Sequence, residues 1–276
     1  MKHITLTVLA LFTSLTLLAE VSNIEKNALI ALYNSTNGAQ WNTSWDINAS
    51  ISTWQGVILE DDYVVEINLP FNNLNGKLPL ELANLTHLKK LNLGFNGLTG
   101  EIPTALSALQ SLEILELFMN KFEGHIPEAL GSLKNLKSLK LYSNKLTGEI
   151  PSSLMQLINL EELLLGSNFL SGTIPASISN LKNLRKFSVM DNKMDGEIPV
   201  EMASLDKLEE LLLSSNAFTG DLPMAFLSLK KLNTIMVSDN KLSQDYVSVS
   251  GKNPPVMLGV DNQNTNATAN MDIEKE

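Results

Sequence analysis

An asparagine recurs every 24 residues along most of this chain of 276 residues. The eight positions are Asn72, Asn96, Asn120, Asn144, Asn168, Asn192, Asn216 and Asn240. Each asparagine stands within the same kind of segment, for example LKKLNLGFNGLTGEIP at residues 88–103. A fixed period of this length is typical of a solenoid, in which each repeat is one coil stacked on the next. The period therefore predicts the architecture, whereas function depends on the variable surface positions.

Two columns of apolar residues predict the strand of each coil. The first column holds Leu91, Leu115, Leu139, Leu163, Phe187, Leu211 and Ile235. The second, two residues later, holds Leu93, Leu117, Leu141, Leu165, Val189, Leu213 and Val237. A spacing of two places both side chains on one face of a strand, with the residue between them facing out. Stacked coils would then form a parallel sheet with strands about 4.8 Å apart.

The repeating asparagine follows each strand, where the backbone turns. Its short amide is suited to bind the backbone of its own turn and of the next coil, so the asparagines are interpreted as a structural ladder. After each turn, a glycine stands three residues before a proline, from Gly76 and Pro79 to Gly220 and Pro223. Glycine permits backbone angles closed to other residues, and proline ends a strand because it lacks an N–H donor.

The consensus LxxLxLxxNxLTGxIPxxLxxL resembles the plant-type leucine-rich repeat, which occurs in receptor-kinase ectodomains, polygalacturonase-inhibiting proteins and secreted bacterial proteins. The resemblance covers residues 64–250. It implies an α/β repeat solenoid of about eight repeats, wound as a right-handed superhelix with a concave parallel sheet. It also implies a second small sheet near the LTGxIP segment, short helical turns on the convex side and an N-terminal helical cap.

The chain divides into five expected segments. Residues 1–19 combine Lys2 with an apolar run too short for a membrane span, which is typical of a signal peptide. Residues 20–63 form the N-terminal cap, residues 64–250 the solenoid and residues 251–260 a C-terminal cap. Residues 261–276 are polar and asparagine-rich, which predicts a disordered tail. We therefore expect a secreted or cell-surface protein, periplasmic if a Gram-negative bacterium retains it.

The chain contains no cysteine. In the plant family the N-terminal cap carries a cysteine pair around a WxGV motif, and the matching segment here is STWQGVIL, with Ser52 and Leu59 where cysteines would stand. We therefore expect the cap to be held by packing of Trp41, Trp45 and Trp54. The segment ALIALYNSTNGAQW, residues 28–41, resembles caps of bacterial and protist repeat proteins, which favours a bacterial source.

The helix of this cap is expected to begin with a capping box made by Ser22 and Glu25. Ile24, Ala28 and Leu32 are expected to share its buried face.

Nothing in the sequence indicates catalysis. Apart from His3, the histidines are His87 and His125, at different positions of their coils, and no nucleophile motif or phosphate-binding loop is present. We therefore predict a non-enzymatic protein with no cofactor and no metal site. The formal net charge of −10 argues against nucleic acid as a partner, because phosphate backbones attract basic surfaces.

Charges on the expected concave face alternate in sign from coil to coil. They are Lys89 and Lys90, Glu113 and Glu116, Lys137 and Lys140, Glu161 and Glu162, Arg185 and Lys186, and Glu209 and Glu210. On neighbouring strands these side chains would form a ladder of ion pairs. We interpret the ladder as structural, worth about 0–1 kcal/mol for each exposed pair.

Apolar residues occupy the two positions before the asparagine in the first four coils. They are Phe71, Phe95, Phe118, Met119 and Tyr142, whereas later coils carry mainly serine, glycine or aspartate there. Exposed aromatic residues on adjacent strands tend to mark a contact surface, so these five residues are the candidate ligand-binding site. The alternative is that the rings pack over the edge of the sheet or on the cap and bind nothing.

Two functional hypotheses follow. The first is an exported recognition module that binds a protein, a peptide or a cell-wall glycan on the concave face of its N-terminal half. The second is a structural or adhesive surface protein that self-associates through its apolar columns without a defined ligand. One such column lies between the core pairs of later coils and is suited either to extend the binding surface or to support a dimer: Leu164, Leu212 and Met236. Ice binding would need a regular array of hydroxyl groups. The relevant column reads Asn75, Thr99, Glu123, Thr147, Ser171, Asp195, Thr219 and Ser243, which is too mixed.

Overall fold

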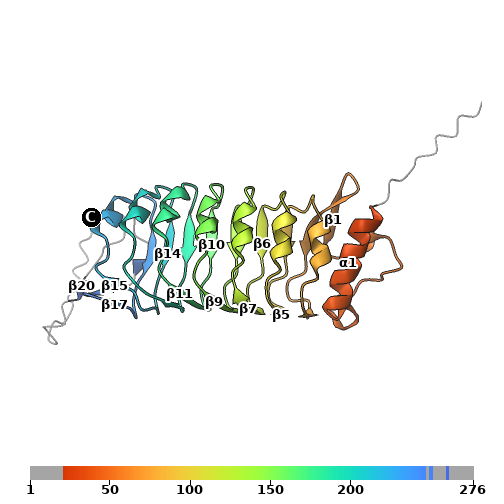
Figure 1. Cartoon of the computed structure of the whole chain (residues 1–276), viewed down its shortest axis with the longest axis horizontal. Helices are drawn as coiled ribbons and strands as arrows, with labels where there is room; N and C mark the ends of the chain where they lie inside the picture. The colour runs from red at the N-terminus through yellow and green to blue at the C-terminus, as the bar shows by residue number, and fades with distance from the viewer. Residues whose placement is uncertain (1–20, 247–248, 251–258, 261–276) are drawn as a thin grey trace, which may run out of the picture.

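The computed structural model describes residues 21–246, 249–250 and 259–260. Its coils stack along the long axis, from the helix α1 at one end to the blue C-terminal coils at the other (Figure 1). The signal peptide expected at residues 1–19, nearly all of the C-terminal cap expected at residues 251–260 and the disordered tail expected at residues 261–276 lie outside the described residues.

Within the described residues, the main sheet has ten strands and runs along the stack of coils. Its strands are β1 (Val57–Glu60), β2 (Tyr63–Asn68), β4 (Lys90–Asn92), β6 (Ile114–Glu116), β8 (Ser138–Lys140), β10 (Glu162–Leu164), β12 (Lys186–Ser188), β14 (Glu210–Leu212), β16 (Thr234–Met236) and β19 (Val249–Ser250). From β2 to β16 neighbours are parallel, with each residue opposite the one 24 positions later, as Leu139 is opposite Leu163. At the two ends β1 and β19 pair antiparallel, with β2 and β16 respectively.

A second set of short strands follows the turns that leave the main sheet. Six form one sheet: β3 (Asn75–Gly76), β5 (Gly97–Gly100), β7 (Lys121–His125), β9 (Lys145–Gly148), β11 (Phe169–Gly172) and β13 (Lys193–Met194). Two further pairs are β15 (Thr219–Gly220) with β17 (Lys241–Leu242), and β18 (Asp245–Tyr246) with β20 (Gly259–Val260). The expected second small sheet near the LTGxIP segment is therefore present.

Each coil returns to the main sheet through one turn of 3-10 helix. These turns are η3 (Leu80–Asn84), η4 (Thr104–Ala108), η5 (Glu128–Ser132), η6 (Ser152–Gln156), η7 (Ala176–Asn180), η8 (Val200–Ser204) and η9 (Met224–Ser228). A proline precedes every one of them, from Pro79 to Pro223, because its fixed φ angle suits the start of a helical turn. The predicted leucine-rich repeat solenoid, with strands on one side and short helical turns on the other, is confirmed.

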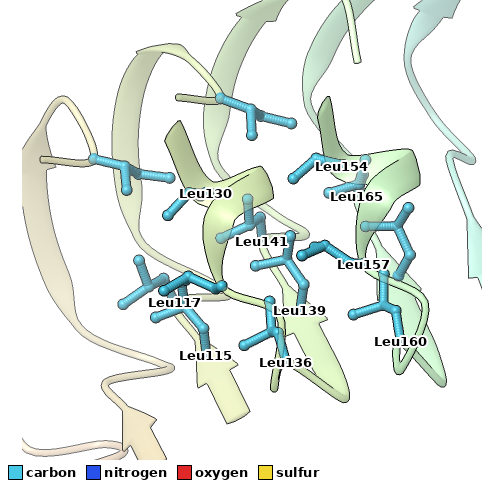
Figure 2. Packing of buried hydrophobic residues seen from close by; sticks show 14 of the residues in the cluster. Leu115, Leu117, Leu130, Leu136, Leu139, Leu141, Leu154, Leu157, Leu160 and Leu165 are labelled. Carbon is cyan, nitrogen blue, oxygen red and sulfur yellow. The ribbon is translucent and has the colours of Figure 1, made fainter. Parts of the chain in front are cut away.

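The core is one continuous cluster that runs through all coils. Leucines from the strands and from the 3-10 turns point toward one another, as Leu139 and Leu141 do toward Leu130 and Leu154 (Figure 2). Every residue of the two predicted core columns is at most 2% exposed. A single coil has no partner for this apolar surface, so its burial depends on the neighbouring coils.

The N-terminal cap consists of α1 (Asn23–Ser35) and two 3-10 turns, η1 (Gly38–Gln40) and η2 (Ile51–Thr53). Trp41, Trp45 and Trp54 are buried and their rings contact one another in series. Each indole N–H donates to a backbone carbonyl at 2.9–3.0 Å, so burial leaves no polar group without a partner. In this cap, packing of the three tryptophans takes the place of the disulfide that the resemblance to the plant family implies.

Two expectations for α1 were only partly right. The backbone N–H of Glu25 donates to Ser22 Oγ at 3.2 Å, but the Glu25 carboxylate does not return to Ser22. It is buried and accepts from Val64 N, 3.4 Å away in β2, so it binds the solenoid instead of completing a capping box. Ile24 is 62% exposed, because the buried face of α1 runs through Ala28, Leu29 and Leu32.

Candidate functional site

The repeating asparagines bind backbone groups of two coils. Asn144 Nδ2 donates to the carbonyl of Leu141 in its own coil and of Leu117 in the preceding coil, at 2.9 and 3.1 Å. Its Oδ1 accepts from Phe122 N of the preceding coil at 3.0 Å. We expected bonds to the following coil, and this was wrong. Backbone N–H groups of each coil point toward the following coil; Leu117 N, for example, donates to Lys140 O. The asparagine that accepts from such an N–H group therefore belongs to the following coil.

The same set of bonds recurs at Asn96, Asn120, Asn168, Asn192, Asn216 and Asn240. Asn72 binds the cap instead, because its Oδ1 accepts from Thr43 N at 2.7 Å and its Nδ2 donates to Thr43 O. These amides are engaged on both sides, which leaves them no free group with which to bind a ligand.

The residue before each asparagine adopts a left-handed backbone conformation, with φ between 51° and 58° in every coil. Serine or aspartate fills this position in coils four to eight: Ser143, Ser167, Asp191, Ser215 and Asp239. In the first three coils it is filled by Phe71, Phe95 and Met119. A left-handed residue with a Cβ costs about 1–2 kcal/mol, and bulky side chains are rare there. The first three coils therefore place bulky apolar residues at strained positions that a small polar residue fills elsewhere.

The aromatic residues among the five candidates form one continuous row across four coils. Phe71 stacks on Phe95 with ring centroids 3.9 Å apart, and Phe118 stacks on Tyr142 at 4.7 Å. Between these pairs, Phe95 meets Phe118 edge to face at 5.3 Å. We call Phe71, Phe95, Phe118 and Tyr142 the aromatic row. The structure thus brings these four candidate residues into contact along the axis of the solenoid.

Burial differs along the aromatic row. Phe71 is 62% exposed, whereas Phe95, Phe118 and Tyr142 are half-buried. The Phe118 ring lies over Gly94, where a Cβ atom would come within 2.5 Å of the ring, so packing accounts for part of its position. Met119 is 39% exposed and has no ring contact. Burial raises the pKa of Tyr142, and its hydroxyl makes no hydrogen bond to any described residue.

A shallow hollow of about 420 Å³ lies beside the first two rings of the row. Its lining residues are Asn42, Phe71, Asn73, Asn75, Phe95, Asn96, Gly97 and Lys121. The hollow sits at the turns that connect the main sheet to the second sheet, and we call it the rim hollow. Sequence reasoning did not single out Asn42, Asn73, Asn75 or Lys121. The one available signal was Gly97, at a position where Lys121, Lys145 and Lys193 stand in other coils.

From Glu113 to Glu210 the alternating charges pair across the strands as the sequence predicts, but Lys89 and Lys90 pair with residues nearer the cap and not with Glu113 and Glu116. In the middle of the sheet Lys140 lies 3.0 Å from both Glu116 and Glu162, and Lys186 reaches Glu162 and Glu210. Nearer the start of the strands, Lys137 pairs with Glu113, and Arg185 with Glu161 and Glu209. Lys89 and Lys90 pair toward the cap, with Glu60 and Glu66.

The ladder changes the protonation equilibria of its central members. Burial opposes the charge of Lys140, but hydrogen bonds to Glu116 and Glu162 raise its pKa above the usual value for lysine. Burial by itself would raise the pKa of Glu162. Hydrogen bonds from Lys140 and Ser138 and the charge of Lys186 outweigh it and hold that pKa below the usual range. Both groups are therefore held in their charged forms, and the network leaves no unpaired charge there for general acid–base chemistry.

Other parts of the surface show fewer features. Leu164, Leu212 and Met236 are half-buried on the concave face of the C-terminal half. Phe169, in the second sheet, is 47% exposed and lies under the Lys193 ammonium, 5.1 Å from its ring centroid. Among the described residues, no group of three or more His, Asp or Glu side chains is arranged to hold a metal ion.

Comparison with known proteins decides the family. A leucine-rich repeat model matches residues 87–109, 111–133, 135–157, 159–181 and 207–229. The BIR2 ectodomain from Arabidopsis thaliana is 30% identical, with a TM-score of 0.55, over 63% of this chain and 94% of its own. This chain belongs to the leucine-rich repeat family. No curated protein matches the sequence of this leucine-rich repeat protein.

Two further solved structures resemble the leucine-rich repeat protein. The plant peptide hormone receptor RGFR1 in complex with RGF2 is 37% identical over 62% of this chain, with a TM-score of 0.60. The chain spans only 27% of that receptor's length. A plant ice-binding protein is 27% identical, with a TM-score of 0.74, over 81% of this chain and 73% of its own. In the part of the chain that is described, no helix has the length and apolar character needed to cross a membrane.

Proposed function

We propose that this protein is an exported, non-enzymatic recognition module that binds a protein, a peptide or a cell-wall glycan on the concave face of its N-terminal half. The observation that carries the proposal is the strained backbone under Phe71, Phe95 and Met119. Three bulky apolar residues occupy left-handed positions that serine or aspartate fills in the later coils. Backbone strain of this kind tends to persist at functional sites, which favours a binding role for these three residues.

The aromatic row supports this proposal in a second way. Four neighbouring rings form an apolar strip next to strands that carry paired charges. Aromatic residues are enriched at the energetically dominant positions of protein interfaces because they bury a large area with few rotatable bonds. The free Tyr142 hydroxyl adds one polar group that can orient a ligand. Resemblance to a plant peptide hormone receptor favours the same class of activity.

The experiment is a binding screen of the protein against glycans, peptides and exported proteins. A Phe95→Ala, Phe118→Ala, Tyr142→Ala triple variant is screened in parallel, because it removes three of the four rings that are in contact along the row. A matched control, the Leu164→Ala, Leu212→Ala, Met236→Ala triple variant, removes apolar area from the concave face of the C-terminal half. We expect a ligand whose affinity falls at least about 100-fold, or 2.7 kcal/mol, in the first variant only. Equal affinity for the parent and the aromatic variant would rule out this site.

The alternative is a structural or adhesive surface protein that self-associates without a defined ligand. The half-buried column Leu164, Leu212 and Met236 is the feature that favours it, since apolar residues on an open sheet are candidates for a contact between copies. Sedimentation across a concentration series tests this alternative. A parent that self-associates, with association weakened in the triple variant at these three residues, would support it. A strict monomer at all concentrations would contradict it.

Resemblance to a plant ice-binding protein raises ice binding as a further function for this chain. The outward residues of the second sheet argue against it, because the charged side chains of Glu123 and Asp195 interrupt the hydroxyl column. Exposed Lys121, Lys145 and Lys193 stand beside that column. We therefore expect no thermal hysteresis from a solution of this protein.

A further inference from the structure

The repeat lacks one side chain at the edge of the rim hollow. The residue after each ladder asparagine is Asn73, Gly97, Lys121, Lys145, Phe169, Lys193, Ala217 and Lys241 in successive coils. At Gly97 the space is taken by Asn75 Oδ1, which lies 2.1 Å from where a Cβ atom would stand. The φ angle of Gly97 is not in the left-handed region, so the backbone itself does not require glycine there. Glycine at this position leaves room for the Asn75 amide at the edge of the hollow.

One wall of the rim hollow is an aromatic face. Phe71 stacks on Phe95 through one face at 3.9 Å, yet it remains 62% exposed. Its left-handed backbone holds the ring at the rim, where small polar residues stand in later coils. An aromatic face carries negative charge density, and it attracts the weakly positive C–H groups on one side of a sugar ring.

The polar groups of the rim hollow include oriented acceptors. Asn42 Nδ2 donates to Phe71 O at 2.7 Å, which fixes the amide and leaves its Oδ1 without a hydrogen bond to any described residue. Asn75 Nδ2 donates to Asn73 O and to Asn73 Oδ1, at 2.9 and 3.0 Å, and its own Oδ1 is likewise without a hydrogen bond to the described part of the chain. Two fixed amide oxygens suit a ligand that presents several hydroxyl donors.

One charged donor completes the hollow. Lys121 is exposed, and its Nζ forms no ion pair or hydrogen bond with the residues that the structure describes. All other polar lining groups are uncharged amides or backbone. An ammonium group beside amide oxygens can donate to hydroxyl or ring oxygens of a neutral ligand, while the acceptors receive its hydroxyl hydrogens.

The rim hollow does not suit an extended peptide strand. The backbone N–H groups of Phe71, Phe95 and Asn96 already donate to carbonyls of the following coil, at 3.0–3.2 Å. A peptide that binds as an added strand needs a free backbone edge, and the coils leave none here. The volume of about 420 Å³ lies within the range of roughly 300–1,000 Å³ that is typical of small-molecule sites.

We propose that the rim hollow is a carbohydrate subsite, which binds one neutral hexopyranose ring of a glycan. The sugar ring lies on the open face of Phe71, its hydroxyls donate to Asn42 Oδ1 and Asn75 Oδ1, and Lys121 Nζ donates to a sugar oxygen. This inference rests on the proposed recognition function and narrows its ligand class at one site.

The test uses the full chain and neutral linear tetrasaccharides of glucose, mannose, galactose and N-acetylglucosamine. Calorimetry at roughly 10 mM sugar detects dissociation constants in the millimolar range, and saturation-transfer NMR identifies the sugar protons in contact with the protein. Gly97→Lys fills the hollow with the residue that four other coils carry at this place, and Phe71→Ser installs the residue of three later coils at the left-handed position. Ala217→Lys is the matched control, at the same position of a distant coil.

We expect at least one tetrasaccharide to bind the parent, with affinity lowered at least about tenfold in Gly97→Lys and in Phe71→Ser and unchanged in Ala217→Lys. No binding by the parent to any of the four sugars would overturn the subsite. Equal binding by Gly97→Lys, or an equal loss in Ala217→Lys, would overturn it as well. None of these outcomes tests the proposed recognition function. That function is tested separately, by the screen that compares ligand binding by the parent and by the Phe95, Phe118 and Tyr142 variant.

Discussion

The N-terminal and C-terminal halves of the solenoid share one backbone and one core but differ on their surfaces. Leu115 and Leu211 occupy the same core column and are both fully buried. At the left-handed position of the same coils, Met119 stands in the first half and Ser215 in the second, with φ of 51° and 58°. Stacking constrains the core equally in every coil. It therefore does not explain why bulky apolar residues stand at the left-handed position only in the N-terminal half. The comparison therefore separates the residues that build the solenoid from those that we assign to recognition.

The largest expected effect tests whether the two halves share one core. Leu115→Ala and Leu211→Ala each remove a fully buried side chain from the first core column. Each should lower the free energy of unfolding by about 2–5 kcal/mol, because both leave a cavity between stacked coils. Urea unfolding followed by circular dichroism measures the loss. A difference of more than about 2 kcal/mol between the two variants would show that the halves are not equivalent.

A smaller effect is expected at the asparagine ladder. Asn144→Ala and Asn216→Ala each remove an amide that binds carbonyls of two coils and accepts a backbone N–H, from Phe122 and Met194 respectively. Each should cost about 1–3 kcal/mol, because backbone groups at the turn lose their partner. The same unfolding measurement applies. A neutral result at either site would mean that water replaces the amide there.

The left-handed position allows a reciprocal exchange between the halves. Met119→Asn should raise the free energy of unfolding by about 0.5–1 kcal/mol, because asparagine adopts this conformation at a lower cost than methionine. Ser215→Met should lower it by a similar amount. Paired urea midpoints give both values. If Met119→Asn also weakens ligand binding, the strained backbone at this position serves ligand binding. If Met119→Asn instead lowers the free energy of unfolding, the Met119 side chain contributes to packing.

The smallest effect concerns the ion-pair ladder that crosses both halves. The folded-state pKa of Glu162 is lowered, so its contribution to stability is present above the unfolded pKa of about 4.3 and is lost as the pH falls through the folded value. Glu162→Gln should therefore cost about 0–1 kcal/mol at pH 7, and the difference from the parent should vanish at strongly acidic pH. Unfolding curves at several pH values test this. A difference that grows as the pH falls would contradict the assignment.

Most of the fold could be predicted because each coil repeats the same local pattern. Alternation around Leu91 and Leu93 marks the strand, and the proline of each coil marks the start of the 3-10 turn. The cap was harder, because it occurs once and its contacts are not repeated. Glu25 is an example: its spacing from Ser22 indicates a capping box, but β2 lies close enough to provide Val64 N as the partner of the carboxylate.

The candidate site was predictable only in part. The sequence places an aromatic residue at one of the two positions before Asn72, Asn96, Asn120 and Asn144, which is enough to expect exposed rings on adjacent strands. It does not show that Phe71 and Phe95 stack face to face, or that Phe118 lies over Gly94. Those relations depend on side-chain directions, which hydrophobic periodicity does not encode.

The sequence by itself determined the solenoid, its core columns and the pairing of charges along the main sheet. It did so because a 24-residue period fixes which residues become neighbours once the coils stack. Only the tertiary structure decided the left-handed backbone under Phe71 and Met119 and the direction of the asparagine bonds. It also decided the rim hollow, in which Gly97 makes room for the Asn75 amide. These features depend on backbone angles and on distances between coils. At such short distances the absence of a Cβ atom, as at Gly97, changes the packing as much as the presence of a side chain does.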